Sequence, residues 1–246
     1  MDINLINSTD TFLFEKVGSM EGFEYSTTRP VIEDISGPKS SIYITSKFGR
    51  RRLSWQSIIS SQADRRLLLQ ACRQQGLIKT IEFSTCDGIA LEAEIEIASV
   101  VMPYKTGKSI VLMEAIAPDW RFYSQIEYTN ESNAANQTIL NNGNEKTDPT
   151  FRIYGPFTSV TITNLHNAET FTILFDEYSE LGAGEYIDVN VKERTVKLSD
   201  GTSIFSGFEG DFITLEPGSN LLQFSKIGGD SNTRLLTTWR DAYNGI

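Results

Sequence analysis

The sequence of 246 residues lacks most of the side chains on which enzyme sites are built. It contains one histidine, His166, and two cysteines, Cys72 and Cys86. Any Ser-His-Asp or Cys-His arrangement would have to use His166, which falls in a predicted turn and is better explained as a solvated turn histidine. The cysteine spacing fits neither a CxxC redox motif nor a four-ligand zinc site, so we expect two buried free thiols. These absences predict that the protein is not an enzyme and has no catalytic residue.

Motifs for metal, phosphate and sugar chemistry are also scarce. Asp230, Asn232, Asp176 and Glu177 are the nearest approach to calcium ligands, but no DxDxDG loop with a distal glutamate accompanies them. The paired glycines lie between predicted strands rather than before a helix, where a phosphate would bind. Composition alone leaves a glycoside hydrolase open, because it needs only two of the 32 acidic residues, although their spacing gives no support. We expect no metal site and no cofactor.

Basic residues are in the minority, and long apolar runs are missing. The 22 Lys and Arg against 32 Asp and Glu give a formal charge of -10, which disfavours nucleic acid and anionic membranes as partners. The first residues do not show the basic segment followed by an apolar segment that is typical of a signal peptide. No run reaches the roughly 18 apolar residues that span a bilayer. We therefore expect that the protein is made in a cytoplasm and either stays there or is assembled from there.

The first half of the sequence combines strands with one helix. The segment 41–46 alternates apolar and polar residues between turn signals and predicts part of a hairpin. Ser61 is a candidate N-cap, followed by Ala63, Leu67, Leu68 and Ala71 at helical spacing and by a glycine stop. Strands with period two follow, and an α+β unit should close near residue 125.

The second half predicts only strands. A polar, turn-rich segment at 128–149 places a domain boundary near residue 130, with domains at 1–130 and 131–246. Beyond it, short apolar segments recur every 10 to 12 residues or so, which is typical of an antiparallel β-sandwich. The region 131–246 also carries twice as many acidic as basic residues, so the two domains should have different surfaces.

Two charged segments are candidates for a subunit interface. Arg50, Arg51 and Arg52 form the one basic cluster and stand close to Trp55, and arginine and tryptophan are enriched in interface cores. A solvated edge strand protected by charge explains the cluster equally well. Its candidate counterpart is the acidic side of the segment 91–98, formed by Glu92, Glu94 and Glu96.

Four longer segments carry a resemblance to a known family. They are VMPYKTGKSIVLMEAIAPDWRFYSQ at 101–125, NNGNEKTDPTFRIYGPF at 141–157, LEPGSNLLQFS at 215–225 and WRDAY at 239–243. Together and in this order they resemble the distal tail protein (Dit) family of siphophages, over most of the chain.

The resemblance implies a mostly β protein with a ring-forming (belt) α+β domain followed by a galectin-like antiparallel sandwich. It further implies a structural role at the virion tail tip, as a homohexameric ring between the tail tube protein and the tail-associated tip protein. Such a ring would serve as a docking hub for a receptor-binding protein, and would be made and assembled in the host bacterial cytoplasm. Because a closed ring has heterologous contacts, each subunit needs two different complementary patches. The alternative is a carbohydrate-binding adhesin that contacts the host cell wall through its C-terminal sandwich, using Trp120, Trp239 or tyrosines as a stacking platform.

Overall fold

The computed structural model describes residues 3–6, 11–14, 17, 20–23, 29–34, 41–47, 50–59, 61–72, 79–85, 88–102, 109–175 and 181–245. The chain forms two compact units, Met1–Gln125 with Tyr243–Ile246, and Ile126–Ala242. The division falls a few residues before the expected boundary near 130. The last residues, which we expected in the second domain, return to the first unit.

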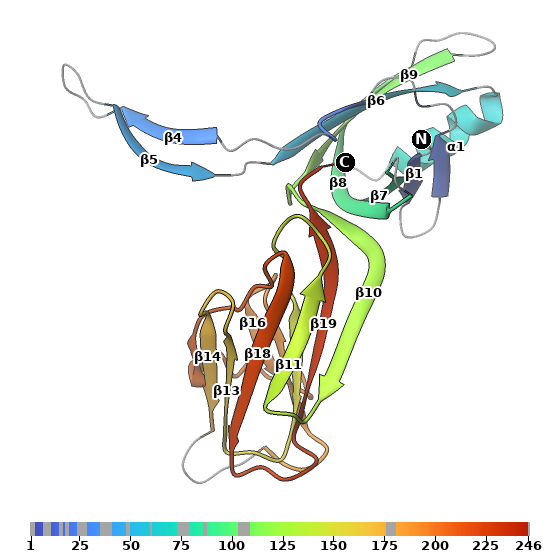
Figure 1. Ribbon diagram of the computed structural model, residues 1–246. Helices are drawn as coiled ribbons and strands as arrows, with labels where there is room; N and C mark the ends of the chain where they lie inside the picture. The colour runs from blue at the N-terminus through green and yellow to red at the C-terminus, as the bar shows by residue number, and fades with distance from the viewer. Residues whose placement is uncertain are drawn as a thin grey trace. The chain divides into compact units, whose positions relative to one another are not determined.

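Unit 1 is built on antiparallel strands (Figure 1). Buried and less buried side chains largely alternate along β1, β6 and β8. One set has the order β10-β8-β7-β1-β2, with bounds Phe122–Ser132, Ala90–Val101, Lys79–Ser84, Ile3–Ile6 and Thr11–Phe14. The other has the order β3-β6-β9-β8, in which β3 is Met20–Glu21, β6 is Arg51–Ile59 and β9 is Ser109–Ala117. Strand β8 belongs to both sets, and its register with β9 shifts between Ile97 and Ser99.

An aromatic cluster fills the core of unit 1. The Trp55 side chain is 1% exposed and makes edge contacts with Phe14 and Phe23, at ring-centroid distances of 5.6 and 6.5 Å. Phe23 stacks on Phe122 at 5.9 Å. Rings of this size bury more apolar area than any aliphatic side chain, so they supply much of the driving force for folding this unit.

The single α-helix of the described residues, α1, spans Gln62–Cys72. Ser61 caps it as expected, because its Oγ accepts a hydrogen bond from the Asp64 amide at 3.1 Å and donates one to the Asp64 carboxylate at 2.7 Å. Only Leu68 and Ala71 are buried, whereas Leu67 of the predicted apolar face is 49% exposed. The helix is therefore buried along a narrower apolar stripe than its sequence predicts.

Strands β4 (Arg29–Asp34) and β5 (Ser41–Lys47) form a separate two-stranded antiparallel sheet (Figure 1). The pairing confirms the hairpin predicted from the segment 41–46. Neither strand pairs with any other described strand.

Unit 2 is the expected antiparallel sandwich of two sheets. The first has the order β16-β15-β12-β19-β10, in which β16 is Thr195–Leu198, β15 is Tyr186–Asn190, β12 is Thr150–Tyr154 and β19 is Arg234–Tyr243. The second has the order β11-β18-β13-β14-β17, with bounds Asn136–Asn141, Gly218–Ile227, Ser159–Asn164, Thr170–Leu174 and Phe208–Gly210. Both sheets contribute to one buried core. For example, the ring centroids of Phe151 in β12 and Phe171 in β14 lie 5.7 Å apart. The described part of this unit contains one short 3-10 turn, Phe205–Gly207, and no α-helix.

Candidate functional site

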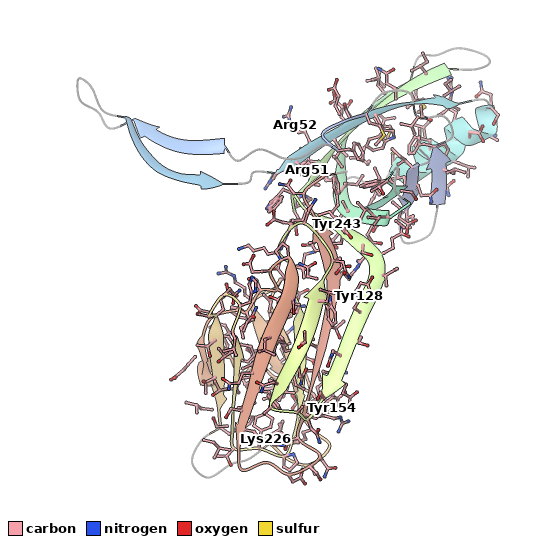
Figure 2. All side chains as sticks on the ribbon, viewed as in Figure 1. Arg51, Arg52, Tyr128, Tyr154, Lys226 and Tyr243 are labelled. Carbon is pink, nitrogen blue, oxygen red and sulfur yellow. The ribbon has the colours of Figure 1, made fainter. Side chains whose placement is uncertain are left out.

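The alternation of strand β6 divides the arginine cluster. Arg50 and Arg52 are exposed, whereas Arg51 is 5% exposed and lies on the same side of the strand as Leu53 and Trp55. The Arg51 guanidinium lies 4.4 Å from the centroid of the Phe122 ring, and its Nη2 donates a hydrogen bond to Oδ1 of Asn244 at 2.9 Å. Arg51 and Trp55 are thus interior residues of unit 1, and only Arg50 and Arg52 remain on its surface (Figure 2 labels Arg51 and Arg52).

The acidic candidates do share one side of strand β8. Glu94 and Glu96 are exposed and Glu92 is half-buried, while Leu91, Ala93 and Ile95 on the other side are in the core. Glu82 of β7 lies directly opposite Glu92 and accepts a weak hydrogen bond from Nδ2 of Asn4 at 3.5 Å. Sequence reasoning missed Glu82, because its alignment with Glu92 depends on strand register. Like charges placed opposite one another raise the local negative potential and disfavour the isolated sheet.

The structure brings the two candidate patches onto one face. Arg52 of β6 and Glu96 of β8 are both cross-strand partners of Ile116 in β9, so they lie in one row on the outward side of the sheet. Two strand spacings separate them, roughly 10 Å. We call this side of β6, β9 and β8 the outer face of unit 1.

A shallow groove of about 420 Å³ lies on the outer face. Its lining combines Arg52 with two carboxylates that sequence reasoning did not single out, Glu21 and Glu114. The rest of the lining is small or neutral, formed by Gly22, Leu53, Ser54, Ala98, Ala115 and Ile116. The groove therefore carries charges of both signs, which suits complementary charges on a polypeptide partner.

The other end of the outer face is aliphatic. Ile58 is paired with Ile110 across β6 and β9, and Leu112 with Val101 across β9 and β8. Their side chains are 40, 57, 41 and 54% exposed, respectively. Four neighbouring exposed aliphatic side chains next to a charged groove make the outer face a candidate protein interface.

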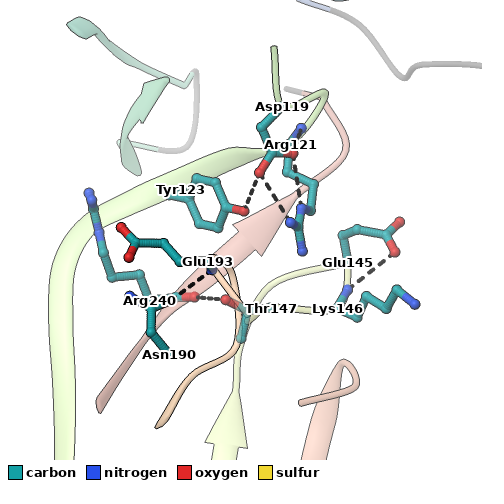
Figure 3. A network of polar contacts seen from close by, with 9 residues as sticks. All are labelled: Asp119, Arg121, Tyr123, Glu145, Lys146, Thr147, Asn190, Glu193 and Arg240. Carbon is teal, nitrogen blue, oxygen red and sulfur yellow. Dashed lines mark hydrogen bonds and ion pairs between the residues drawn. The ribbon is translucent and has the colours of Figure 1, made fainter. Parts of the chain in front are cut away.

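The segment APDWRFY of the family resemblance forms a polar turn before β10 (Figure 3). Arg121 donates to both carboxylate oxygens of Asp119 at 3.1 Å, and the Tyr123 hydroxyl donates to Asp119 at 2.6 Å. Burial alone would raise the pKa of the Asp119 carboxyl, but these hydrogen bonds and the Arg121 charge hold that pKa below its usual value. The turn is therefore a structural device rather than a reactive site.

The other three segments of the resemblance meet in unit 2. Asn141 donates to the carbonyl oxygens of Glu145 and Leu215, at 2.9 and 3.2 Å. Asn142 donates from its amide and its side chain to Asp241, which is 2% exposed. We call this meeting point the three-segment junction.

Thr147 completes the three-segment junction by donating to the carbonyl of Arg240 at 2.7 Å (Figure 3). Each buried polar group named here has a partner, as a stable interior requires. These three segments of the resemblance thus form a structural junction.

The remaining candidates fall in unremarkable places. His166 lies in an exposed turn, as expected. Cys72 is a free thiol, as expected, but it is half-buried rather than buried. Its partial burial raises the pKa of the thiol to about 11, although the Lys79 charge acts in the opposite direction. Cys86, Asp176 and Glu177 lie outside the described residues. In the part of the chain that the structure describes, no group of three or more His, Cys, Asp or Glu could hold a metal ion. No helix there has the length and apolar character to span a bilayer.

The architecture defines a mostly β protein with an α+β first unit and a sandwich second unit, which is the fold of phage distal tail and baseplate proteins. The similar solved structures include the crystal structure of SPP1 Dit (gp 19.1), described as a hub of the adsorption apparatus in phages that infect Gram-positive bacteria. It matches with a TM-score of 0.69 and 15% identity, over 96% of this chain and 98% of that one.

A second similar structure is the baseplate of phage P2 in its activated, Ca-bound conformation. It has a TM-score of 0.50 and 10% identity, covering 100% of this chain and 99% of that one. No protein-family model matches the sequence, and no curated protein is significantly similar to it.

Proposed function

We propose that this chain is a non-enzymatic structural component of a bacteriophage tail tip. Six copies form a ring between the tail tube protein and the tail-associated tip protein, and the ring serves as a docking hub for a receptor-binding protein. The virion tail is its final location, after synthesis and assembly in the host cytoplasm. The likeness to SPP1 Dit over nearly the full length of both chains supports the fold that this role needs.

The observation that carries the proposal is the hairpin β4–β5. Its strands pair with each other and with no other described strand. A lone two-stranded hairpin is marginally stable in water, and a third strand or packing against another surface is needed for independent stability. A neighbouring copy supplies that surface in a ring, where the contact is repeated around the symmetry axis.

The outer face of unit 1 is our candidate for the contact between copies. It offers aliphatic side chains at one end and the charged groove with Arg52, Glu21 and Glu114 at the other. Arg50 also remains available for this contact, since it is exposed, and the acidic residues Glu94 and Glu96 extend the surface along β8. Arg51 and Trp55 then stabilise the subunit that carries the contact.

Solution mass and imaging test the ring. Six copies of the 27.5 kDa chain have a mass of about 165 kDa, which light scattering after size exclusion would measure. Negative stain should show six-fold rings, and amides of 29–34 and 41–47 should exchange more slowly in rings than in monomers. The double variant Ile110→Glu with Leu112→Glu should lower the mass, whereas Thr195→Glu on a sheet of unit 2 should leave it unchanged. A wild-type protein that stays monomeric at high concentration, with no rings, would overturn the proposal.

Three of the aromatic rings that the adhesin alternative could use, those of Trp239, Tyr154 and Tyr186, are covered. Trp239 is 8% exposed, stacks on Tyr128 at 5.7 Å and donates its indole N–H to the carbonyl of Leu140. Tyr154 and Tyr186 are each covered by an arginine guanidinium, at 4.1 and 4.2 Å from the ring centroid. These rings are occupied by the protein itself, so they form no open platform for a sugar.

A further inference from the structure

Four neighbouring strands in one sheet of unit 2 carry no charged side chain on their outward side. The outward residues of β11, β18, β13 and β14 are Asn136, Thr138, Leu140, Ser219, Leu221, Gln223, Ser225, Ile227, Thr161, Thr163, Thr170, Thr172 and Leu174. In a region with twice as many acidic as basic residues, this composition sets the face apart from the rest of the surface. Depletion of charge is a mark of the centre of a protein interface. We call these strands' outward side the uncharged face.

Hydrogen bonds within the uncharged face hold its side chains in place. Thr161 and Thr172 are cross-strand partners whose hydroxyl oxygens lie 2.9 Å apart, and Thr163 and Thr170 repeat the contact at 2.8 Å. Because these rotamers are already fixed, a partner that covers them loses less conformational entropy on binding.

A cluster of leucines marks one corner of the uncharged face. Leu140, Leu165 and Leu221 are 51, 52 and 39% exposed. Leu221 lies opposite Thr138 of β11, and its carbonyl accepts a hydrogen bond from the amide of Leu165 at 2.9 Å. This leucine corner is suited to an aliphatic side chain of a partner.

Two carboxylates border the opposite edge. Glu209 of β17 is the cross-strand partner of Thr172, and the Asp211 amide donates to the carbonyl of Thr170 at 2.8 Å. Both side chains are exposed. The strand registers place Glu209 across from Ser225, three strand spacings from β18 and four residues along it from Leu221. The separation is roughly 20 Å, which an extended peptide covers in about six residues.

We propose that the uncharged face binds an extended segment of a second tail protein. The segment places an aliphatic side chain on the leucine corner and, about five or six residues away, a lysine or arginine beside Glu209 and Asp211. This inference rests on the proposed function, since it needs the chain to be part of a tail.

The composition of the uncharged face favours this occupant over three others. It offers no cation to an anionic wall polymer and no aromatic ring to a sugar. The uncharged face has an area of about 400 Å². Each partner in a stable dimer buries about twice that area, so the face is too small to hold two free copies together. A short segment repeated around a ring gains the missing affinity through avidity.

The test replaces the wild-type gene in the phage by variants and measures the protein composition of purified tails by mass spectrometry. Leu221→Glu and Glu209→Lys should each reduce the same second tail protein about ten-fold or more, with this chain retained at the wild-type level. Lys197→Glu, an exposed change on the other sheet, should leave the composition unchanged. Reversing the basic residue in the lost protein should restore its binding to the Glu209→Lys tails.

Four outcomes separate the alternatives. Unchanged composition in both variants overturns the inference. Unchanged composition with reduced adsorption to cell walls assigns the face to a wall polymer, and a changed mass of the purified chain assigns it to a second copy; either result overturns the inference. Absence of this chain from wild-type tails contradicts the proposed function itself. Thermal unfolding of the purified variants at the wild-type temperature shows that the fold is intact.

Discussion

At the scale of single residues, polar groups in unit 1 stabilise turns and interior contacts rather than activate a nucleophile. Asp119 is the clearest case, since Arg121 and Tyr123 both donate to its carboxylate. The side chains of Arg121 and Asp119 are only 12 and 19% exposed, so solvent screens this contact weakly. The carboxylate is therefore a stabilising group whose effect should depend on pH.

Asp119→Asn should lower the free energy of unfolding at neutral pH by about 1.5–3 kcal/mol, because hydrogen bonds to a charged group are lost. The folded-state pKa of Asp119 is lowered, so its contribution is complete above the unfolded value of about 4 and is lost as pH falls through the folded value. Urea unfolding at about pH 7 and about pH 3 should show the difference between wild type and variant shrinking at the lower pH. Asp211→Asn, at an exposed site, is the matched control and should change little at either pH. A difference that is the same at both pH values would show that the charge of Asp119 contributes nothing.

At the scale of secondary-structure elements, the three-segment junction explains why a glycine stands at position 143. A Cβ added to Gly143 would lie 2.0 Å from the carbonyl oxygen of Ala242 and 2.7 Å from its nitrogen. The close backbone approach also brings Asn142 within reach of Asp241. The strands that meet here depend on a residue without a side chain.

Gly143→Ala should therefore destabilise unit 2 by about 1–3 kcal/mol through overpacking. Because the same displacement would break the Asn142–Asp241 hydrogen bonds, Gly143→Ala and Asp241→Asn should be non-additive by about 0.5–3 kcal/mol. Denaturant unfolding of the two single variants and the double variant measures this coupling. The pair Gly143→Ala with Thr195→Ala serves as the control and should be additive. Additive costs in the first pair would mean that Gly143 does not position Asn142.

Some secondary-structure elements could be predicted from the sequence, whereas features that depend on strand pairing could not. The Ser61 cap, the hairpin and the sandwich strands follow from local patterns, because they depend on neighbours in the sequence. The sequence also contains the alternation of Arg51, Leu53 and Trp55 along one strand, and this pattern predicts that Arg51 points into the core. The pairing of Glu82 opposite Glu92 could not be predicted from the sequence, because strand register depends on pairing between distant segments. The uncharged face is likewise defined only when four strands are set side by side.

At the scale of the whole molecule, the buried apolar side chains divide into two sets, one in each unit. Leu53 belongs to the set that contains Trp55, and Ile162 to the set that contains Phe151. The two cores differ in sequence locality, since unit 2 is one continuous segment and unit 1 includes the chain's last residues. Separate cores are the basis for separate stabilities.

We therefore expect the two units to unfold in two steps. Leu53 is 1% exposed and Ile162 is 0% exposed, and replacing either by alanine should cost about 2–5 kcal/mol. In differential scanning calorimetry, Leu53→Ala should lower the transition of unit 1 and leave that of unit 2 in place, while Ile162→Ala should do the reverse. The exposed substitution Lys197→Ala should shift neither transition. If both transitions move together in each variant, the two cores form one cooperative structure, and the sandwich could not be altered independently of the part that we propose forms the ring.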